Sequence, residues 1–225
     1  GLEKAKNLKI EGTFTHLAFA DEPKNPVIDE QLDRFEQALA VMTKHGIEPG
    51  IRHIANSAAT LARSDAHADM VRPGIALYGL APGPQVPDTD PLKPVLSLKA
   101  RVVQVKRVQP GEGVSYSHRW HADRETTIAS IPLGYADGWP RALTNDARVL
   151  IGGKPHPAVG TVTMDSFMVD CGDTPVKVGD EAVLIGTQDD QTLTADELAL
   201  RLGTINYEIV TRLSQRLPRE HRNSA

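Results

Sequence analysis

The sequence is poor in the features that mark membrane, secreted and nucleic-acid-binding proteins. Its single cysteine, Cys171, excludes an internal disulfide framework and fits a reducing compartment. No apolar run approaches the roughly 18 residues of a membrane span, and no signal-peptide core is recognisable. The net charge is -4 without any polybasic patch, so neither nucleic acid nor an anionic membrane is expected as a partner. These absences predict a soluble, cytoplasmic protein.

What is present indicates a folded chain of ordinary composition. Its 225 residues, 40% of them hydrophobic, suffice for one large domain or two modest ones with packed cores. Neither an internal repeat nor a low-complexity tract appears. The chain begins with Gly1 rather than methionine, so we expect the native N-terminus to be missing.

The first part of the chain alternates strand and helix signals. Residues 10–20 form a β-prone run that ends in a turn signal. Apolar residues then recur at spacings of three and four over residues 28–42, which predicts an amphipathic helix with Gly46 as its C-cap.

A second β-α unit begins at Gly50. There an extended run meets Asn56 and Ser57, good N-cap residues, before a short helix over residues 58–62. A third strand is expected over residues 70–79. Strands that alternate with helices imply parallel pairing, either in an open sheet or in a barrel.

The composition changes between Leu80 and Pro94, where five prolines in fifteen residues exclude a helix or an inner strand. We place a domain boundary there, with one domain over residues 1–93 and a second over residues 94–225. Short β-prone runs separated by glycine-containing turns predict that the second domain is an antiparallel β domain. These runs cover residues 96–108, 127–132, 148–151, 159–164, 167–169 and 182–185.

Local signals add detail to the second domain. The apolar alternation slips by one residue at positions 102–103, which suggests a β-bulge. Thr194 stands three residues before a glutamate, as in a capping box, and predicts a helix that Gly203 closes. A second short helix is expected over residues 205–213.

Polar side chains gather in the stretch from Gly113 to Trp120, which contains Tyr116. This stretch is either a solvated loop or an active site, since polar residues collect in both. In a parallel β/α arrangement the ligand lies at the C-terminal ends of the strands. That rule singles out His16, which is otherwise a satisfied core histidine.

The same rule singles out residues 56–57 and 72–75. Asn56 and Ser57 open a helix, where free amides favour a phosphate, and Gly74 and Ile75 let the backbone approach closely. Routine N-capping and a turn are the alternatives for these positions. Arg72 beside them is a phosphate clamp, a ring-nitrogen partner or a structural ion pair.

Other polar positions have simpler interpretations. His118 and His121 stand three residues apart in a loop without a cysteine or a carboxylate cluster, so no metal is expected. Asp137 and Arg141 fit a surface turn, and Met164 fits a core position.

Seven strings together resemble the alanine racemase family. They occur in the family's order over nearly the whole chain, and such a series is far more specific than a single glycine motif. The strings are THLAFAD from Thr15, HIANSAA from His53, MVRPGIALYGLAP from Met70, GVSYSHRW from Gly113, IPLGYADGWPR from Ile131, GTVTMDSFMVD from Gly160 and GTINYEIVTRLSQRLPR from Gly203.

The resemblance implies an α/β plus all-β fold. The last strands of a (β/α)8 TIM-like barrel would be followed by a C-terminal antiparallel β domain. Family members begin with a K-A-x-A-Y-G-H-G string whose lysine forms a Schiff base with pyridoxal 5′-phosphate, and no such string occurs here. None of the ten lysines is expected at the end of a barrel strand. The chain therefore resembles the C-terminal portion of a racemase and is expected to be inactive by itself.

The resemblance assigns Tyr116 as the catalytic tyrosine, one of two bases on opposite faces of the substrate Cα. The missing lysine would serve the other face. His16 and Arg72 match residues that link this tyrosine toward the pyridine nitrogen, where Arg72 keeps that nitrogen unprotonated and limits side reactions such as transamination.

The resemblance also assigns the remaining cofactor and substrate contacts. Ser57, the backbone of Gly74 and Ile75, and Tyr207 would hold the phosphate, with Asn56 opening the helix beside them. Pro73 would remove one backbone donor from this phosphate site.

Three further residues match family positions close to the substrate. Met164 and Asp165 would approach its carboxylate from the other subunit, and Tyr135 would guard the channel through which it enters. The implied active unit is a homodimer with shared active sites.

We therefore expect a fragment of an enzyme that interconverts L-alanine and D-alanine and supplies D-alanine for peptidoglycan. Two alternatives remain open. One is a related amino-acid racemase of broader specificity, and the other is a non-catalytic module that binds phosphate or dimerises.

Overall fold

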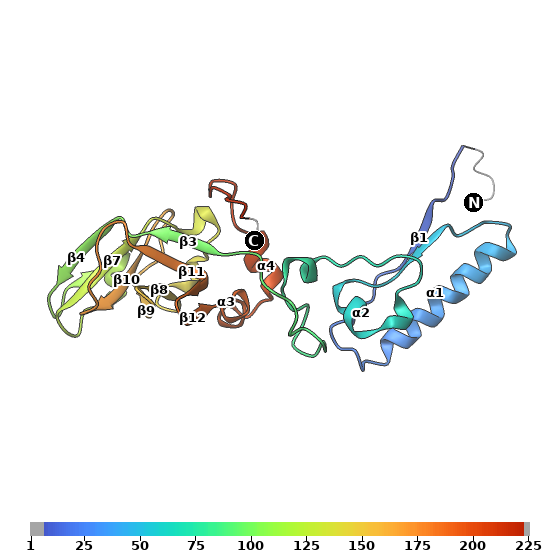
Figure 1. Cartoon of the computed structure of the whole chain (residues 1–225), viewed down its shortest axis with the longest axis horizontal. Coiled ribbons are helices and arrows are strands. Elements are labelled where there is room, and N and C mark those ends of the chain that lie inside the picture. The colour runs from blue at the N-terminus through green and yellow to red at the C-terminus, as the bar shows by residue number, and fades with distance from the viewer. Residues whose placement is uncertain (1–6, 223–225) are drawn as a thin grey trace. The chain divides into compact units, whose positions relative to one another are not determined.

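The computed structural model describes residues 7–222, and the chain divides into two compact units, residues 1–95 and 96–225 (Figure 1). The first unit is α/β and the second is built on antiparallel β-strands. Among the described helices, none combines the length and the apolar character needed to cross a membrane.

Helix α1, Val27–Lys44, is the longest element of the first unit (Figure 1). It buries Ile28, Phe35 and Leu39, which all belong to the predicted apolar stripe, in the hydrophobic core of this unit. Gly46 follows the C-cap in a left-handed conformation (φ +71°), which a glycine adopts without steric cost. The predicted helix is therefore confirmed.

Strands β1, Gly12–Phe14, and β2, Ile51–His53, pair in parallel, as the alternation of strands and helices predicts. The strand expected over residues 10–20 is shorter than predicted. Past β1 the chain turns, and the Ala18 amide donates to the Gln31 side chain at 2.9 Å rather than to a neighbouring strand.

The strand expected over residues 70–79 is wrong. Met70 forms only an isolated parallel bridge with His53, and Ile75–Tyr78 is a 3-10 helix, η3. Pro73 has no N–H to donate to a ladder. Gly79 then turns the chain with φ +73°, so close to the backbone of Lys93 that a Cβ would overlap its carbonyl. Local backbone chemistry overrides the β-prone side chains of this segment.

Short helix α2, Ser57–Ala62, begins where the sequence predicts. The Asn56 side chain caps it by accepting from the Ala59 amide at 3.0 Å. The cap fixes the position of Ser57, the first residue of the helix, which is buried.

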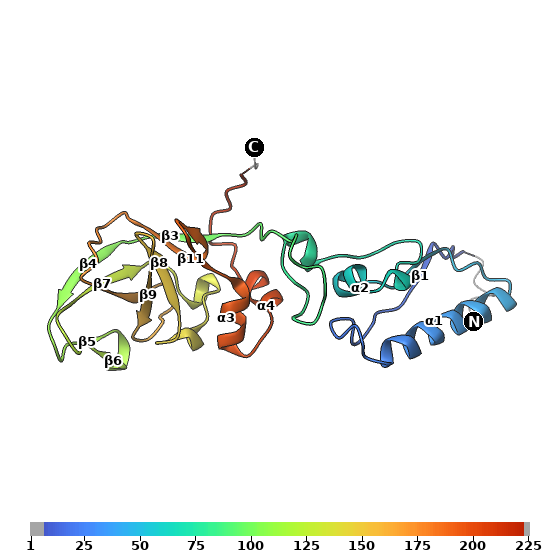
Figure 2. The ribbon, with the colours of Figure 1, turned by 60° about the horizontal axis from the view of Figure 1, so that its bottom comes forward.

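In residues 96–222, the described part of the second unit, there are ten strands, and every pairing between them is antiparallel. The main sheet has the order β12-β11-β8-β9-β10-β7-β4, with β3 on β11, and β5 and β6 form a separate hairpin (Figure 2). The strands are β3 Leu98–Arg101, β4 Gln104–Val108, β5 Gly113–Val114, β6 Trp120–His121, β7 Thr126–Ile131, β8 Arg148–Ile151, β9 Lys154–Val159, β10 Phe167–Gly172, β11 Glu181–Gln188 and β12 Gln191–Leu193.

The predicted bulge at residues 102–103 marks a change of partner strand. Strand β3 pairs with β11, whereas β4 pairs with β7 on the other side of the sheet. Between them the Val102 amide donates to Asp180 and the Val103 amide to Ser130, at 2.9 and 3.0 Å. One continuous segment, residues 98–108, therefore pairs with β11 through its first part and with β7 through its second, and so joins two distant strands of the sheet.

The strand expected over residues 159–164 is also wrong, because β9 ends at Val159. The strand instead covers Lys154–Val159. Pro155 and Pro157 within it are untypical of an inner strand, so the sequence did not predict it. The amide of Ala158 donates toward β8, so the prolines point their nitrogens at β10. There the register includes only Ala158 and Val159, and the missing donors are not needed.

Helices α3, Ala195–Leu202, and α4, Asn206–Thr211, follow the strands of the second unit (Figure 2). Thr194 accepts from the Glu197 amide at 3.0 Å, and Gly203 closes α3 with φ +64°, both as predicted. The Glu197 carboxylate instead binds Arg148 of β8 at 2.6 Å. That ion pair ties α3 to the sheet.

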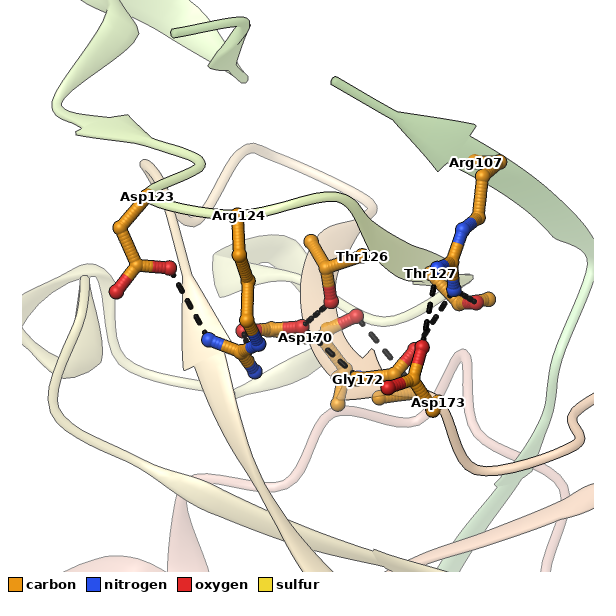
Figure 3. A network of polar contacts seen from close by, with 10 residues as sticks. Arg107, Asp123, Arg124, Thr126, Thr127, Asp170, Gly172 and Asp173 are labelled. Atoms are coloured by element: carbon orange, nitrogen blue, oxygen red, sulfur yellow. Dashed lines mark hydrogen bonds and ion pairs between the residues drawn. The ribbon is translucent and has the colours of Figure 1, made fainter. Parts of the chain in front are cut away.

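Strands β7 and β10 are joined at one end by the buried carboxylate of Asp170 (Figure 3). The Thr126 hydroxyl and the Gly172 amide donate to the same oxygen, and Arg124 lies 3.5 Å from the other. The register between β7 and β10 shifts here, so Cys171 is the extra residue of a bulge.

Cys171 is buried within this bulge. Burial, and secondly the negative charge of Asp170, raises the pKa of the Cys171 thiol to about 12. Since the thiolate is the reactive form, we expect an aromatic disulfide reagent at pH 8 to leave the native protein unmodified. The thiol should react fully once urea unfolds the chain. Stoichiometric labelling of the native protein at the rate of a free cysteine would contradict this burial.

Candidate active site

Arg72 is the centre of the polar residues in the first unit. Its guanidinium lies 2.9 Å from Nδ1 of His53 and 3.3 Å from Nδ1 of His16. It also donates to the carbonyls of Thr15 and Ile54, at 3.0 and 3.2 Å. A guanidinium only donates, so both histidines accept through Nδ1 and carry their proton on Nε2. These contacts fix both the place of Arg72 and the tautomers of its neighbours.

An aromatic stack supports the same guanidinium. Arg72 lies 5.5 Å from the ring centroid of Phe14, and Phe14 stacks on His53 with centroids 5.3 Å apart. Sequence reasoning missed Phe14 and His53. His53 could have been recognised from its position, because it is the last residue of β2 and His16 was selected for its place at the C-terminal end of a strand.

Ser57 is buried and gathers backbone amides. The amides of Gly74 and Ala76 donate to its hydroxyl oxygen at 2.8 and 3.3 Å. A serine hydroxyl accepts two hydrogen bonds and donates one, so its proton is directed away from both amides. Gly74 is exposed, and a Cβ on it would meet nothing within 4 Å. The backbone at Gly74 is therefore open to close approach, whereas the amides of Gly74 and Ala76 are occupied by Ser57 and Ile75 is buried.

Tyr116 stands at the start of a strained loop in the second unit, and 72% of it is exposed. Ser115, Ser117 and His118 all have positive φ, at 65°, 60° and 42°. For residues with side chains such conformations cost about 1–3 kcal/mol each, and they persist only where surrounding contacts enforce them. Strain of this kind is typical of functional sites.

Thr161 supplies the enforcing contacts. Its hydroxyl donates to the Tyr116 carbonyl at 2.8 Å, and its own carbonyl accepts from the Ser115 hydroxyl at 2.7 Å. Gly160 before it has φ +72°, and a Cβ there would lie 2.8 Å from the Val114 carbonyl. The main chain on both sides of the phenol is thus held by a buried residue.

We expect Thr161→Val to lower the free energy of unfolding by about 1 kcal/mol, the net value of one hydrogen bond lost at nearly constant shape. Urea unfolding measures it. The matched control is Thr187→Val. Thr187 is an exposed strand residue, and among the described residues its hydroxyl bonds only the hydroxyl of Thr192. Equal stability of the two variants would show that the Thr161 hydroxyl does not restrain the loop.

Tyr135, Met164 and Asp165 come together beside one turn. The amides of Tyr135 and Ala136 donate to the carbonyls of Thr163 and Met164, at 3.0 and 2.9 Å. All three candidate side chains are exposed, Tyr135 at 44% and Met164 at 58%, so Met164 does not fill a core.

The interpretation of residues 137–141 as a surface turn is wrong in part. Asp137 is 4% exposed, and Trp139 is 1% exposed and stacks on Phe167 with centroids 5.5 Å apart. No pattern in the sequence indicates that Asp137, between Tyr135 and Trp139, is buried. Sequence reasoning therefore missed Asp137.

The two loop histidines interact with each other. The rings of His118 and His121 lie edge to face with centroids 5.9 Å apart. His118 also covers Gly113, where a Cβ would come within 2.4 Å of its ring. Within residues 7–222 there is no group of three or more histidine, cysteine, aspartate or glutamate side chains able to hold a metal ion.

Comparison with known proteins connects these features. Residues 95–221 match the family profile described as "Alanine racemase, C-terminal domain", and residues 1–82 match that described as "Alanine racemase, N-terminal domain". The chain belongs to the alanine racemase family.

Curated alanine racemases resemble most of this chain. That of Thermobifida fusca is 53% identical over 217 residues, and that of Frankia casuarinae is 49% identical over 222 residues. These alignments include 96% and 98% of this chain but 58% of each relative. The chain thus spans less than two thirds of the length of the alanine racemases it matches.

Solved alanine racemases share its fold. The structure from Streptomyces coelicolor has a TM-score of 0.91 at 46% identity, covering 96% of this chain and 57% of that one. The structure from Bartonella henselae, which carries covalently bound pyridoxal phosphate, has a TM-score of 0.80 at 35% identity, covering 92% and 55%.

The candidate residues of this alanine racemase family member fall into two groups. Those in the segment that matches the N-terminal domain surround Arg72 and Ser57. Those in the segment that matches the C-terminal domain surround Thr161 and the Tyr135 turn, except Tyr207, which lies in α4. The first group is His16, Asn56, Ser57, Arg72, Gly74 and Ile75, and the second is Tyr116, Tyr135, Met164, Asp165 and Tyr207.

Proposed function

We propose that this chain forms part of a pyridoxal-phosphate-dependent alanine racemase that interconverts L-alanine and D-alanine. The observation that carries the proposal is Tyr116, an exposed phenol on a strained loop whose main chain is clamped by Thr161. In this role it would be one of the two bases that racemisation requires, because a proton removed from one face of Cα must be replaced from the other. A free phenol titrates near pH 10, so a cationic neighbour in the assembled site must favour the phenolate.

The donor set of the first unit fits a phosphorylated pyridine cofactor. The Ser57 hydroxyl and the backbone of Gly74 and Ile75 would hold the phosphate, since the Gly74 and Ala76 amides already gather at Ser57 and the Cβ position of Gly74 is open. Asn56 fixes the helix start beside them, and Tyr207 would be a further phosphate ligand. Bound pyridoxal phosphate would supply an electron-withdrawing ring that acidifies the α-hydrogen of the amino acid.

Arg72 would face the ring nitrogen of the cofactor. A guanidinium remains protonated at any physiological pH, so Arg72 donates a hydrogen bond and releases no proton. The contacts to His16, His53 and two carbonyls would hold this donor in one orientation. Arg72 would thereby keep the ring nitrogen unprotonated.

Tyr135, Met164 and Asp165 would act on the substrate side. Met164 and Asp165 would approach the substrate carboxylate of the partner subunit, and Tyr135 would guard its path of approach. Their exposure suits contact with a second chain, and the active unit would be a homodimer with shared active sites.

The parallel pairing of β1 and β2 is consistent with the last part of a TIM-like (β/α)8 barrel, to which the first unit would belong. The whole enzyme would act in the cytoplasm and supply D-alanine for peptidoglycan. The ten lysines include none at the end of a described parallel strand, although Lys4 and Lys6 lie outside the described residues. We therefore propose that the 225-residue chain does not racemise alanine by itself.

The proposal is tested in a completed enzyme, defined as this chain preceded by the N-terminal segment of the Thermobifida fusca relative. Loaded with pyridoxal phosphate, it should convert L-alanine to D-alanine faster than it converts serine or lysine. Equal or faster turnover of a bulkier amino acid would favour a broad-specificity racemase. Tight binding of pyridoxal phosphate by the 225-residue chain, with no turnover by the completed enzyme, would favour a non-catalytic module.

A further inference from the structure

The Asp137 carboxylate is buried, which is costly for a charge unless partners replace its water. Two partners do so from different parts of the chain. The Gly134 amide donates to Oδ2 at 3.0 Å, and Nε of Arg216 lies 3.4 Å from Oδ1. In addition, the Ser214 amide donates to the main-chain carbonyl of Asp137 at 2.9 Å. We call these four residues, Gly134, Asp137, Ser214 and Arg216, the Asp137 clasp.

One side of the clasp is the turn that carries Tyr135. This turn is registered on the Met164 loop by the backbone hydrogen bonds of Tyr135 and Ala136. At Gly134 the contact is so close that a Cβ would lie 2.4 Å from the Thr163 carbonyl and 2.5 Å from the Asp165 amide nitrogen. The turn and the Met164 loop must therefore move together.

The other side of the clasp is the chain leaving α4, the helix that contains Tyr207. Gly138 lies against this exit, since a Cβ on it would come within 2.4 Å of the Arg212 carbonyl. Arg216 is itself largely exposed, and its guanidinium pairs with Asp137 where the Ser214 amide already holds this segment to the turn. The Asp137 carboxylate, together with these main-chain contacts, thus connects the Tyr135 turn and the Met164 loop to the chain that follows α4.

We propose that Asp137 is a positioning residue that holds Tyr135, Met164 and Tyr207 in a fixed mutual arrangement for substrate binding. This inference rests on the proposed function, in which those three side chains surround the substrate or cofactor. Asp137 touches neither, because its carboxylate is buried and occupied by Gly134 and Arg216. Its removal should therefore alter substrate binding more than the proton transfer at Tyr116.

The kinetic test uses Asp137→Asn and Arg216→Ala in the completed enzyme. Asparagine still accepts from Gly134 but loses the charge that attracts Arg216, so we expect KM for alanine to rise about tenfold while kcat stays within about twofold. Arg216→Ala should raise KM about threefold, because the arginine is exposed. The control is Arg222→Ala, an exposed arginine of the same tail that pairs with Glu220. A KM unchanged in both clasp variants would overturn the proposal.

A second readout does not need activity. Amide hydrogen exchange in the 225-residue chain should be faster at Gly134 in Arg216→Ala than in Arg222→Ala, at equal global stability. Faster exchange supports the clasp even if the completed enzyme proves inactive, an outcome that would defeat the proposed function alone. Unchanged exchange at Gly134 overturns the clasp. Arg216→Ala decides the question if Asp137→Asn does not fold, since it replaces an exposed residue.

Discussion

Tyr116→Phe is expected to lower kcat for alanine racemisation by the completed enzyme by about 10²- to 10⁴-fold, the usual contribution of a general acid–base group. The variant removes only the phenolic oxygen. Thr161 holds the loop through the main-chain carbonyl of Tyr116, and the ring is exposed, so the fold of the loop does not depend on that oxygen. The loss should appear in kcat, measured by coupled assay in both directions.

Tyr78→Phe is the matched control for this variant. Tyr78 is also an exposed tyrosine, at 61%, and it is not among the candidate site residues. We expect it to retain wild-type turnover. Retention of half the wild-type kcat by Tyr116→Phe would mean that another group moves the proton on that face, and the role assigned to Tyr116 would fail.

Trp139→Ala is expected to lower the free energy of unfolding by about 3–5 kcal/mol, because it removes a fully buried aromatic side chain and leaves a cavity. Trp139 is 1% exposed and stacks on Phe167 of β10. Its amide also donates to the Gly134 carbonyl at 3.1 Å, so the residue lies directly against the Tyr135 turn. Urea unfolding of the 225-residue chain measures the loss, and the thiol of Cys171 reports it independently.

Trp139→Phe separates packing from polarity. The indole Nε1 is buried without a hydrogen-bond partner within residues 7–222, so its loss removes no hydrogen bond. Phenylalanine can keep a ring against Phe167, and we expect less than half of the destabilisation of the alanine variant. If Trp139→Ala unfolds at the wild-type midpoint, the side chain is not part of the core that holds the turn.

Periodicity and capping chemistry predicted the helices of this chain because both act locally. The apolar stripe of α1 and the side-chain caps at Asn56 and Thr194 need only neighbouring residues. The prediction of a strand over residues 70–79 was wrong because Pro73 cannot donate a backbone hydrogen bond and Gly79 adopts a left-handed conformation. These two residues outweigh the β-prone side chains around them. Strand β9 was missed for the opposite reason, since its prolines are tolerated where no ladder partner needs them.

The candidate site was predictable where residue type and strand-end position agreed. His16, Ser57 and Arg72 satisfy that condition, and the structure places Arg72 beside His16 and Ser57 beside Gly74. The contacts that hold the site depend on residues distant in sequence. Thr161 meets Ser115 and Tyr116 across some 45 residues, and Arg216 meets Asp137 from the far end of the chain, so no local pattern reveals them.

The role of Tyr116 is tested most directly by exchange of the alanine α-hydrogen with deuterated solvent in the completed Tyr116→Phe enzyme. If Tyr116 serves one face of Cα and a second base the other, one enantiomer should still exchange its α-hydrogen without inversion, while the other should exchange at least about 100-fold more slowly. Equal exchange of both enantiomers, whether fast or slow, would contradict the assignment of Tyr116 to a single face.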